Sequence, residues 1–259
     1  MGERIQDFRA RLTGGAPLIG TFVKTPSPII CEVLAQAALD VICLDAEHAP
    51  FGRMEIDSCV AALRAADQPS LVRVGSDTAV EIQWALDCGA TGILVPHVTT
   101  EGQAAAIARA ARFGEGGRGY SGSTRAAGFG SKGMRDHIDD SDAHVTVVVQ
   151  IEDLAALDSA AAIAAVDGID GIFIGRMDLA VAMGKDPSTP GVVDAVAAIC
   201  AAGRKAGVAV GMFTPGIDEI PRWRAAGAGL FLLGSDQGFV LSGARQIAAA
   251  FHERSNEGR

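Results

Sequence analysis

The stretch 145-VTVVVQIEDLAALDSAAAIAAVDGIDGIFIG-175 decides the fold, because it places two apolar runs on either side of an alanine-rich segment. The runs 145–152 and 170–175 are almost continuously apolar, as a strand that is covered on both faces must be. The segment between them is typical of a helix. Strand, helix and strand in this order predict parallel strands in an α/β fold.

The same alternation extends through the chain. Helical segments at 78–89, 100–112 and 192–207 begin near Thr or Asp, and several end at Gly, as capped helices do. Eight strand–helix repeats in a chain of 259 residues predict a single (β/α)8 barrel domain over residues 1–259. The main alternative is a doubly wound open sheet, but no G-x-G-x-x-G follows an early strand. Besides the two runs above, the predicted strands are 17–23, 41–45, 70–74, 92–96, 208–213 and 229–234.

Composition narrows the class of protein. Hydrophobic residues make up 49% of the chain and charged residues 20%, which predicts a soluble domain with a large buried core. The formal net charge is −9, and no short segment collects lysine and arginine. We therefore expect no binding to nucleic acid or to an anionic membrane.

The N-terminal segment and the cysteines indicate a cytoplasmic protein. Residues 1–15 carry a charge every few positions and contain no apolar run of the length found in signal peptides. The apolar runs 145–151 and 229–234 are too short to span a bilayer. The five cysteines are scattered without a CxxC pair, so we expect small buried residues rather than disulfides.

The glycine-rich stretch 114–133 resembles a phosphate-binding loop only superficially. It lacks the G-K-[ST] ending and does not directly follow a strand. We expect a mobile loop at the active site. Its two arginines, Arg118 and Arg125, could close over an anionic substrate, although loop arginines are usually solvated.

Polar side chains gather where the predicted strands end. Barrel enzymes place their chemistry at the carboxyl ends of the strands, so these residues are expected on one rim. Acidic groups and other metal-ligating types dominate the set. Its members are Asp45, Glu47, His48, Arg73, His97, Gln150, Glu152, Asp178 and Asp236.

Glu152 and Asp178 follow neighbouring strands and could share one metal ion. Together with Gln150 and water they would form the oxygen-rich site that Mg²⁺ or Mn²⁺ prefers. Such a site can hold the carboxylate and keto oxygens of a 2-oxo acid. The alternative is that each carboxylate caps the following helix, and the spacing alone leaves the two roles equally open.

Asp45 and His48 lie three residues apart, just beyond a predicted strand. The carboxylate could orient the imidazole and raise its basicity for proton transfer, or the pair could simply stabilise a polar turn. Arg73 lies inside the apolar run LVRV and needs an anion, because a buried unpaired guanidinium is costly. That anion is either Glu47 or a substrate oxygen.

Two further residues are weaker candidates. His97 follows Pro96 and is expected to be structural. Lys24 is the lysine nearest to a strand end, so a Schiff-base mechanism has only this poorly placed residue available.

Taken together, these segments resemble the HpcH/HpaI aldolase family, which includes the hydroxy-oxo-heptanedioate and 2-keto-3-deoxy-sugar-acid aldolases. The resemblance covers most of the chain, and the matching stretches occur in the same order. They are 41-VICLDAEHAPF-51, 71-LVRV-74, 92-GILVPHVTTEGQA-104, 117-GRGYSGSTRA-126, 148-VVQIED-153 and 170-DGIFIGRMDLA-180.

The resemblance implies roles for most of the rim residues. Glu152 and Asp178 would bind a divalent metal, Mg²⁺ or Mn²⁺, with Co²⁺ or Zn²⁺ as further options. Arg73 would stabilise a pyruvate enolate, and His48, paired with Asp45, would act as the general base. Gln150 would contact the pyruvyl group, and the backbone of Gly175, Met177 and Asp178 would receive the pyruvyl carboxylate. Phe213 would contact the aldehyde, and Glu47 would support the site without touching the substrate.

Family members are usually hexamers whose last helix packs on a neighbouring subunit. This makes 236–251 a candidate exchange element. The family commonly has Gly-Pro before the metal-binding segment and Ser after its Leu. This chain has Gly175-Arg176-Met177-Asp178-Leu179-Ala180 instead, which is expected to affect substrate choice more than metal binding.

The expected reaction is the reversible cleavage of a 4-hydroxy-2-oxo acid into pyruvate, or hydroxypyruvate, and an aldehyde. Two rival reactions use the same enolate and metal, namely decarboxylation of oxaloacetate and a citrate-lyase-type cleavage of an acyl-CoA. The acidic composition does not favour a CoA substrate, which needs basic contacts for its phosphates. A non-catalytic barrel that binds a small acid is the remaining alternative.

Overall fold

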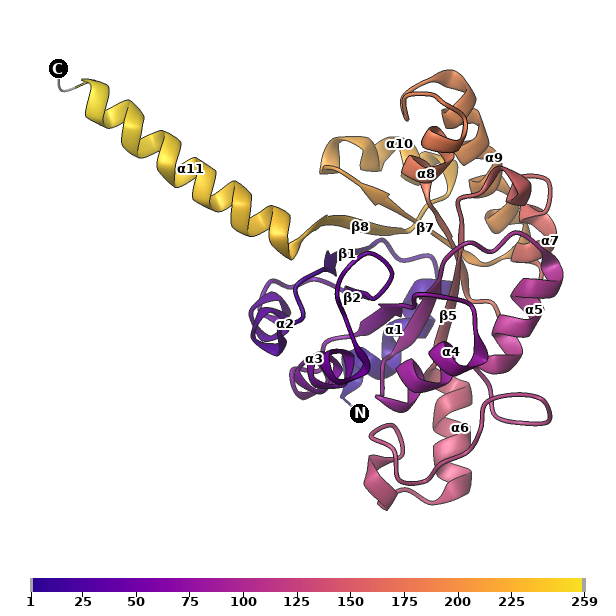
Figure 1. Cartoon of the computed structure of the whole chain (residues 1–259). Coiled ribbons are helices and arrows are strands. Elements are labelled where there is room, and N and C mark those ends of the chain that lie inside the picture. Colours follow the sequence, from indigo (N-terminus) through magenta and orange to yellow (C-terminus); the bar gives the residue numbers. More distant parts are fainter. Residues whose placement is uncertain (1, 258–259) are drawn as a thin grey trace.

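In the computed structural model, which describes residues 2–257, eight parallel strands form a closed barrel (Figure 1). Each strand pairs with the next along the chain, and β8 pairs with β1. The predicted (β/α)8 barrel is confirmed. The strands are β1 Leu18–Val23, β2 Val41–Asp45, β3 Ser70–Arg73, β4 Gly92–Val95, β5 Thr146–Ile151, β6 Gly171–Ile174, β7 Ala209–Thr214 and β8 Leu230–Ser235.

Helices surround the barrel and follow most of the strands. They are α1 Glu3–Thr13, α2 Pro28–Ala35, α3 Arg53–Ala65, α4 Ala79–Asp87, α5 Glu101–Ala110, α6 Met134–His144, α7 Ala160–Ala164, α8 Arg176–Ala182, α9 Pro190–Ala206, α10 Ile220–Ala226 and α11 Asp236–Glu257. Short 3₁₀ turns lie at η1 Gly128–Gly130, η2 Leu154–Ala156 and η3 Ile217–Glu219. Within residues 2–257, no helix has both the length and the apolar character needed to cross a membrane.

The predicted strands agree with the observed ones to within two residues at either end, because the apolar runs are largely buried. The caps also agree. The Thr100 hydroxyl accepts a hydrogen bond from the Gln103 amide at the start of α5. At the end of α9, Gly207 takes the left-handed conformation, with φ of 76°.

Side chains alternate between two apolar cores along the strands. One set points outward and packs against the helices, while the other points into the barrel and fills its interior. Phe8 and Leu12 of α1 belong to the interior core, so this helix closes the amino-terminal end of the barrel. The carboxyl end is left for polar side chains. The interior strand residues are Leu18, Phe22, Val41, Cys43, Leu71, Leu94, Val148, Phe173, Leu230 and Leu232.

The last helix, α11, extends away from the barrel (Figure 1). Its first residue, Asp236, is buried, and its carboxylate accepts hydrogen bonds from the amides of Lys24 and Thr25. The loop after β1 is therefore tied to the start of α11. Farther along, the helix exposes apolar side chains at Val240, Leu241, Ile247 and Phe251.

Candidate active site

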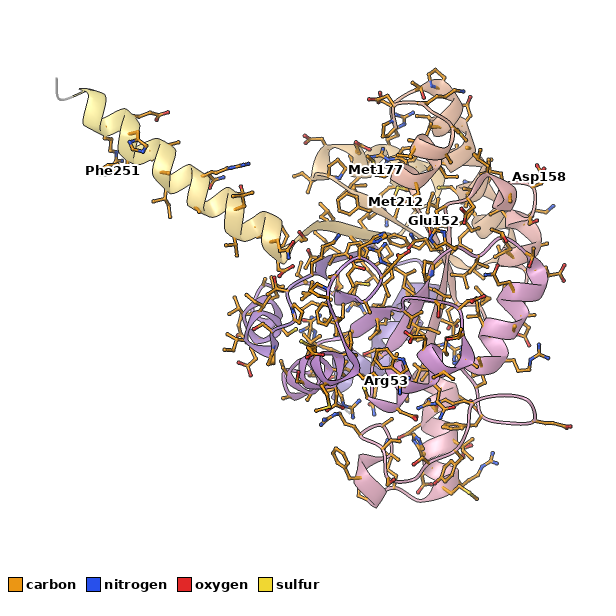
Figure 2. All side chains as sticks on the ribbon, in the orientation of Figure 1. Arg53, Glu152, Asp158, Met177, Met212 and Phe251 are labelled. Atoms are coloured by element: carbon orange, nitrogen blue, oxygen red, sulfur yellow. The ribbon has the colours of Figure 1, made fainter. Side chains whose placement is uncertain are left out.

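A cavity of about 540 Å³ opens at the carboxyl end of the barrel. Glu152 and Met177 lie at this end (Figure 2). Residues expected at the site from the sequence make up much of the wall, namely His48, Arg73, Gln150, Gly175, Met177, Asp178 and Phe213. Lys24, Ser235 and Gln237 complete the wall on the side of β1 and β8.

Glu152 and Asp178 meet around Gly175. A Cβ atom on Gly175 would lie 2.7 Å from Glu152 Oε2 and 3.3 Å from Asp178 Oδ2. The two carboxylates therefore border one small space, which the absence of a side chain at residue 175 keeps open. Glycine is needed here because of this close approach.

The structure excludes helix capping, one of the two roles left open for these carboxylates. The N-cap of α8 is Gly175, and Asp178 lies inside the first turn without a capping hydrogen bond. Glu152 accepts hydrogen bonds from the His97 amide, at 2.9 Å, and from the Gln150 amide group. Neither carboxylate caps a helix. Burial raises the pKa of Glu152, against the opposing effect of these hydrogen bonds.

Gly175→Ala is expected to disturb the packing and to fill the space between the two carboxylates, where a divalent ion is expected from the sequence. The new Cβ would lie 2.4 Å from the Glu152 Cβ, so the Glu152 side chain would have to move. Such overpacking typically costs about 1–3 kcal/mol of unfolding free energy. Urea unfolding and a Mn²⁺ titration measure the two effects. Gly216→Ala is the control, because nothing lies within 4 Å of its new Cβ; equal behaviour of the two variants would contradict the account.

Arg73 lies between two carboxylates. Its Nε and Nη2 donate to Asp45 at 3.0 and 2.8 Å, and its Nε is 3.2 Å from Glu47 Oε2. The guanidinium also stacks over the Phe22 ring, 4.6 Å from the centroid. Burial favours a higher pKa for Asp45, but hydrogen bonds and charge from Arg73 outweigh burial and hold that pKa below its usual value. In the described chain, Arg73 Nη1 has no hydrogen-bond partner and remains for a ligand.

The expected pairing of the His48 imidazole with Asp45 is absent. Asp45 accepts a hydrogen bond from the backbone amide of His48, at 3.1 Å, while its carboxylate faces Arg73 and Lys24. The imidazole is half exposed, lines the cavity and has its Nε2 3.7 Å from Glu47 Oε2. Arg73 and Lys24 occupy this buried carboxylate, and charge-assisted hydrogen bonds of this kind are strong. Glu47, rather than Asp45, is the carboxylate nearest to the His48 imidazole.

A second group of potential metal ligands consists of Glu47, His97 and Glu152. His97 was expected to be structural, and it has the left-handed φ of 57° just after β4. Its Nε2 is 3.3 Å from Glu47 Oε1, and its Nδ1 is 3.1 Å from Asp153 Oδ2. Its Nδ1 is also 3.4 Å from Glu152 Oε1, so His97 links the two carboxylates of this group, while Glu47 Oε2 has no hydrogen-bond partner among the described residues. Asp178, by contrast, has no hydrogen-bond or ion-pair partner in residues 2–257.

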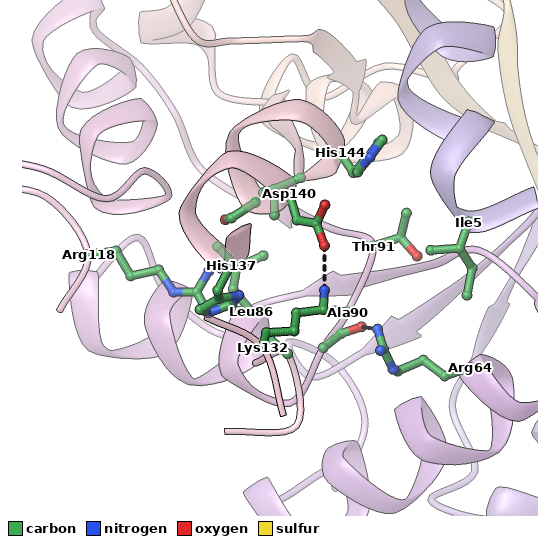
Figure 3. A pocket seen from close by; sticks show the side chains of 14 residues that line it. Ile5, Arg64, Leu86, Ala90, Thr91, Arg118, Lys132, His137, Asp140 and His144 are labelled. Carbon is green, nitrogen blue, oxygen red and sulfur yellow. Dashed lines mark hydrogen bonds and ion pairs between the residues drawn. The ribbon is translucent and has the colours of Figure 1, made fainter. Parts of the chain in front are cut away.

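The glycine-rich loop does not reach this cavity, contrary to expectation. Arg118 is buried and pairs with Asp87 at the end of α4, and Arg125 donates to Asp57 of α3 at 2.6 Å. Carboxylates on the outer helices thus hold both arginines away from the carboxyl end of the barrel. Figure 3 shows Arg118 in a different, small cavity, where it lies with Ile5 of α1 and Thr91, which precedes β4.

Arg176 and Met177, which replace the residues common in the family before Asp178, differ in their surroundings. Arg176 is buried and donates to Glu219, at 3.3 Å from Nη2 to Oε1, and its guanidinium lies 5.6 Å from the Trp223 ring centroid. This links the start of α8 to the loop after β7. Met177 is half exposed and lines the cavity. Phe213, also on the wall, lies 6.4 Å from Phe22 between ring centroids.

Known proteins match this chain along nearly its full length. The family model described as HpcH/HpaI aldolase/citrate lyase matches residues 18–242. A 5-keto-4-deoxy-D-glucarate aldolase of Klebsiella pneumoniae is 36% identical over 247 residues, 94% of this chain and 96% of that protein. A 4-hydroxy-2-oxovalerate aldolase of Rhodococcus jostii is 36% identical over 257 residues, 97% of this chain and 98% of that protein.

The solved structures agree with the sequence matches. The crystal structure of a HpcH/HpaI aldolase/citrate lyase family protein from Burkholderia cenocepacia superimposes with a TM-score of 0.90. It is 35% identical, and the match covers 95% of this chain and 99% of that one. The chain therefore belongs to the HpcH/HpaI aldolase/citrate lyase family and is a carbon–carbon lyase.

Proposed function

We propose that this enzyme is a divalent-metal-dependent aldolase that cleaves 4-hydroxy-2-oxo acids into pyruvate, or hydroxypyruvate, and an aldehyde. The observation that carries the proposal is the convergence of Glu152 and Asp178 on Gly175, beside Gln150 and Arg73. Asp178 on the cavity wall and Glu152 beside Gly175 offer anionic ligands for a cation, and Arg73 offers a guanidinium for an oxyanion. Among the described residues, no comparable group of side chains supports a polymer or nucleotide substrate.

The residues around Gly175 fit a cation. Gln150 is almost fully buried, and its Oε1 has no hydrogen-bond partner among the described residues. An unpaired buried acceptor beside two carboxylates calls for a positive group. We propose Glu152 and Asp178 as the ligands, with Mg²⁺ or Mn²⁺ as the preferred ions for an oxygen-only set. When bound, the ion would polarise the keto oxygen of the substrate.

Arg73 and the start of α8 would hold the 2-oxo acid. Arg73 lines the cavity, and its Nη1, which has no hydrogen-bond partner in the described chain, would stabilise the negative charge that develops on the keto oxygen. The amide of Gly175 already donates to the Ile151 carbonyl, at 3.0 Å. The amides of Met177 and Asp178 lie in the first turn of α8 and would receive the substrate carboxylate.

His48 is proposed as the general base. It would remove the proton from the C4 hydroxyl, and the C3–C4 bond would break to release the aldehyde. The bonding electrons move to the keto oxygen of the enolate, and protonation at C3 then gives pyruvate. Glu47, 3.7 Å from His48 Nε2, would orient the imidazole. Phe213 would contact the aldehyde portion.

A direct test incubates pyruvate and hydroxypyruvate with a panel of aldehydes and reads the products by mass spectrometry. The purified protein is first treated with a chelator, and Mg²⁺, Mn²⁺, Co²⁺ or Zn²⁺ is then added back separately. The proposal predicts aldol products that disappear after chelation and return with a divalent ion. Full activity in the chelated protein would contradict it.

We further propose that the enzyme is a homo-oligomer, a hexamer as is usual in the family, assembled through α11. The helix extends from the barrel and exposes Val240 and Ile247, which are 66% and 74% exposed. A second copy of the chain is the natural cover for such a surface.

Val240→Glu/Ile247→Glu is expected to lower the mass of the assembly, because charges on this face oppose apolar packing between subunits. Light scattering after size exclusion measures the mass. Lys205→Glu, an exposed change on α9, is the control and should assemble like the wild type. Unchanged mass in the double variant would refute the role of α11.

A further inference from the structure

An ion pair joins the start of α8 to the turn after β7. Arg176, the first residue of α8, donates from Nη1 and Nη2 to the Glu219 carboxylate, with Nη2 3.3 Å from Oε1. Arg176 is 7% exposed, and its Nε has no hydrogen-bond partner among the described residues. The buried guanidinium therefore depends on Glu219 for its compensation.

Trp223 connects this pair to the hydrophobic core. The residue is 1% exposed, and its indole Nε1 donates to Glu219 Oε2 at 3.1 Å. The Arg176 guanidinium lies 5.6 Å from the centroid of the same ring, within the range of a cation–π contact. Figure 1 shows α8 next to α10, the helix that carries Trp223. One buried ring thus contacts both members of the ion pair.

The pair lies close in sequence to a proposed metal ligand. Asp178 follows Arg176 by two residues, in the first turn of α8, and lines the cavity. Its carboxylate has no hydrogen-bond or ion-pair partner within residues 2–257, so no side chain fixes it directly. The position of Asp178 is therefore set by the helix turn that carries it.

Contacts with the rest of the protein must place that turn. The α8 helix has seven residues, and a helix of this length is not stable by itself in water. The Gly175 amide donates to the Ile151 carbonyl at 3.0 Å, and Leu179 is fully buried. Between these two contacts, Arg176 ties the first turn to Glu219.

We propose that Arg176 and Glu219 are positioning residues that fix the first turn of α8 and so place the Asp178 carboxylate beside Glu152 for a divalent ion. This assignment rests on the proposed metal-dependent function and adds two residues to it. Neither residue touches the ion or the substrate. Without the pair, the turn gains conformational freedom, and holding the two carboxylates together around an ion costs more entropy.

The test measures the affinity of the purified protein for Mn²⁺, with free Mn²⁺ followed by electron paramagnetic resonance. Arg176→Ala and Glu219→Gln should each weaken binding about tenfold, the lower end of the usual effect of losing a residue that orients a metal ligand. Charge alone predicts opposite signs, because removing a cation favours Mn²⁺ and removing an anion disfavours it. Opposite shifts in the two variants would overturn the proposal.

Two further measurements test whether the residues act as a unit through position. The double variant Arg176→Ala/Glu219→Gln should lose no more affinity than either single variant, and losses that add would count against the pair. At saturating Mn²⁺, exchange of the pyruvate methyl protons with D₂O should recover most of its wild-type rate, because the ligands themselves are unchanged. Slow exchange together with unchanged Mn²⁺ affinity would overturn the positioning role.

Arg176→Pro tests the placement of the backbone directly. Proline at the first helical position fixes φ by itself, and the amide that it removes has no intrahelical acceptor. Gly175 precedes it and has no Cβ for the ring to meet. Arg176→Pro should therefore bind Mn²⁺ more tightly than Arg176→Ala, and Glu219→Gln should have no further effect in the proline variant. Equal losses in the proline and alanine variants would contradict the proposal.

Controls separate the pair from the fold and from the metal site. Arg222 lies 4.8 Å from the Trp223 centroid but is not part of the ion pair, so Arg222→Ala should bind Mn²⁺ like the wild type. Urea unfolding checks each variant, and Glu219→Gln decides if Arg176→Ala does not fold. Unchanged Mn²⁺ affinity in Asp178→Asn would overturn the proposed metal site. Weakened affinity in Asp178→Asn with wild-type affinity in Glu219→Gln would overturn only the positioning role.

Discussion

Asp178→Asn and Glu152→Gln are each expected to lower kcat by about a thousandfold, since in the proposed mechanism the metal ion would supply several kcal/mol of charge stabilisation. Asp178 is exposed to the cavity and has no other partner in the described chain, so its substitution should leave the fold intact. Glu152 is buried among hydrogen bonds, which a glutamine side chain at this position can only partly reproduce. Asp178→Asn is therefore the cleaner variant.

The measurement is a Mn²⁺ titration combined with turnover, and His97→Gln is the matched control. His97 belongs to the second group of potential ligands, with Glu47 and Glu152. If Glu152 and Asp178 bind the ion, Asp178→Asn weakens metal affinity much more than His97→Gln. Stronger loss in His97→Gln would instead place the ion at Glu47, His97 and Glu152, and a ligand set with an imidazole would favour Zn²⁺ or Co²⁺.

Arg73→Lys is expected to lower kcat by about a hundred- to a thousandfold, as loss of one oxyanion donor typically does. Lysine keeps the positive charge beside the buried Asp45 but cannot donate to it in the bidentate manner of arginine. The ammonium will stay with Asp45 and Glu47, and no donor equivalent to Nη1 will face the substrate. The loss should appear in kcat more than in KM.

Arg73→Met would be a poorer test than Arg73→Lys, because it is expected to destabilise the fold. Removing the guanidinium leaves Asp45, which is fully buried, with Lys24 as its one remaining cation in residues 2–257. Breaking a buried pair in this way costs about 3–5 kcal/mol of stability. Urea unfolding of both variants separates folding from catalysis. A stable Arg73→Lys protein with wild-type kcat would contradict the role of Arg73.

The sequence predicted the barrel well because the strand signal is local. Every strand is a mostly apolar run, and the position of the polar residues at or just beyond its end follows from the connectivity. The gathering of Gln150, Asp178 and Arg73 around one cavity follows from the same rule. Their chemical roles were supplied by the resemblance to a family and remain predictions.

Side-chain partners were predicted less well, because they depend on neighbouring strands and helices. The spacing of Asp45 and His48 suggested a dyad, yet the register between β2 and β3 places Arg73 directly beside Asp45. Arg118 and Arg125 lie among glycines that suggested mobility, but Asp87 and Asp57 on distant helices hold them. No sequence pattern reveals such pairings.

Two residues gained importance in the structure. His97 and Lys24 follow β4 and β1. His97 contacts Glu47 and Lys24 contacts Asp45, although the sequence showed each only as an isolated polar residue beside a strand end. Position at the carboxyl end of a barrel strand was the available signal. This signal marks every residue at the rim alike, so it does not tell which side chains contact one another.

The central claim is that Glu152 and Asp178 hold an ion that, with Arg73, makes pyruvate acidic. Proton NMR of pyruvate in D₂O tests this most directly, because methyl exchange reports enolate formation without any aldehyde. The account predicts exchange in the wild type with Mg²⁺ or Mn²⁺, none after chelation, and at most slow exchange in Asp178→Asn. Rapid exchange in the chelated wild type, or in Asp178→Asn, would contradict it.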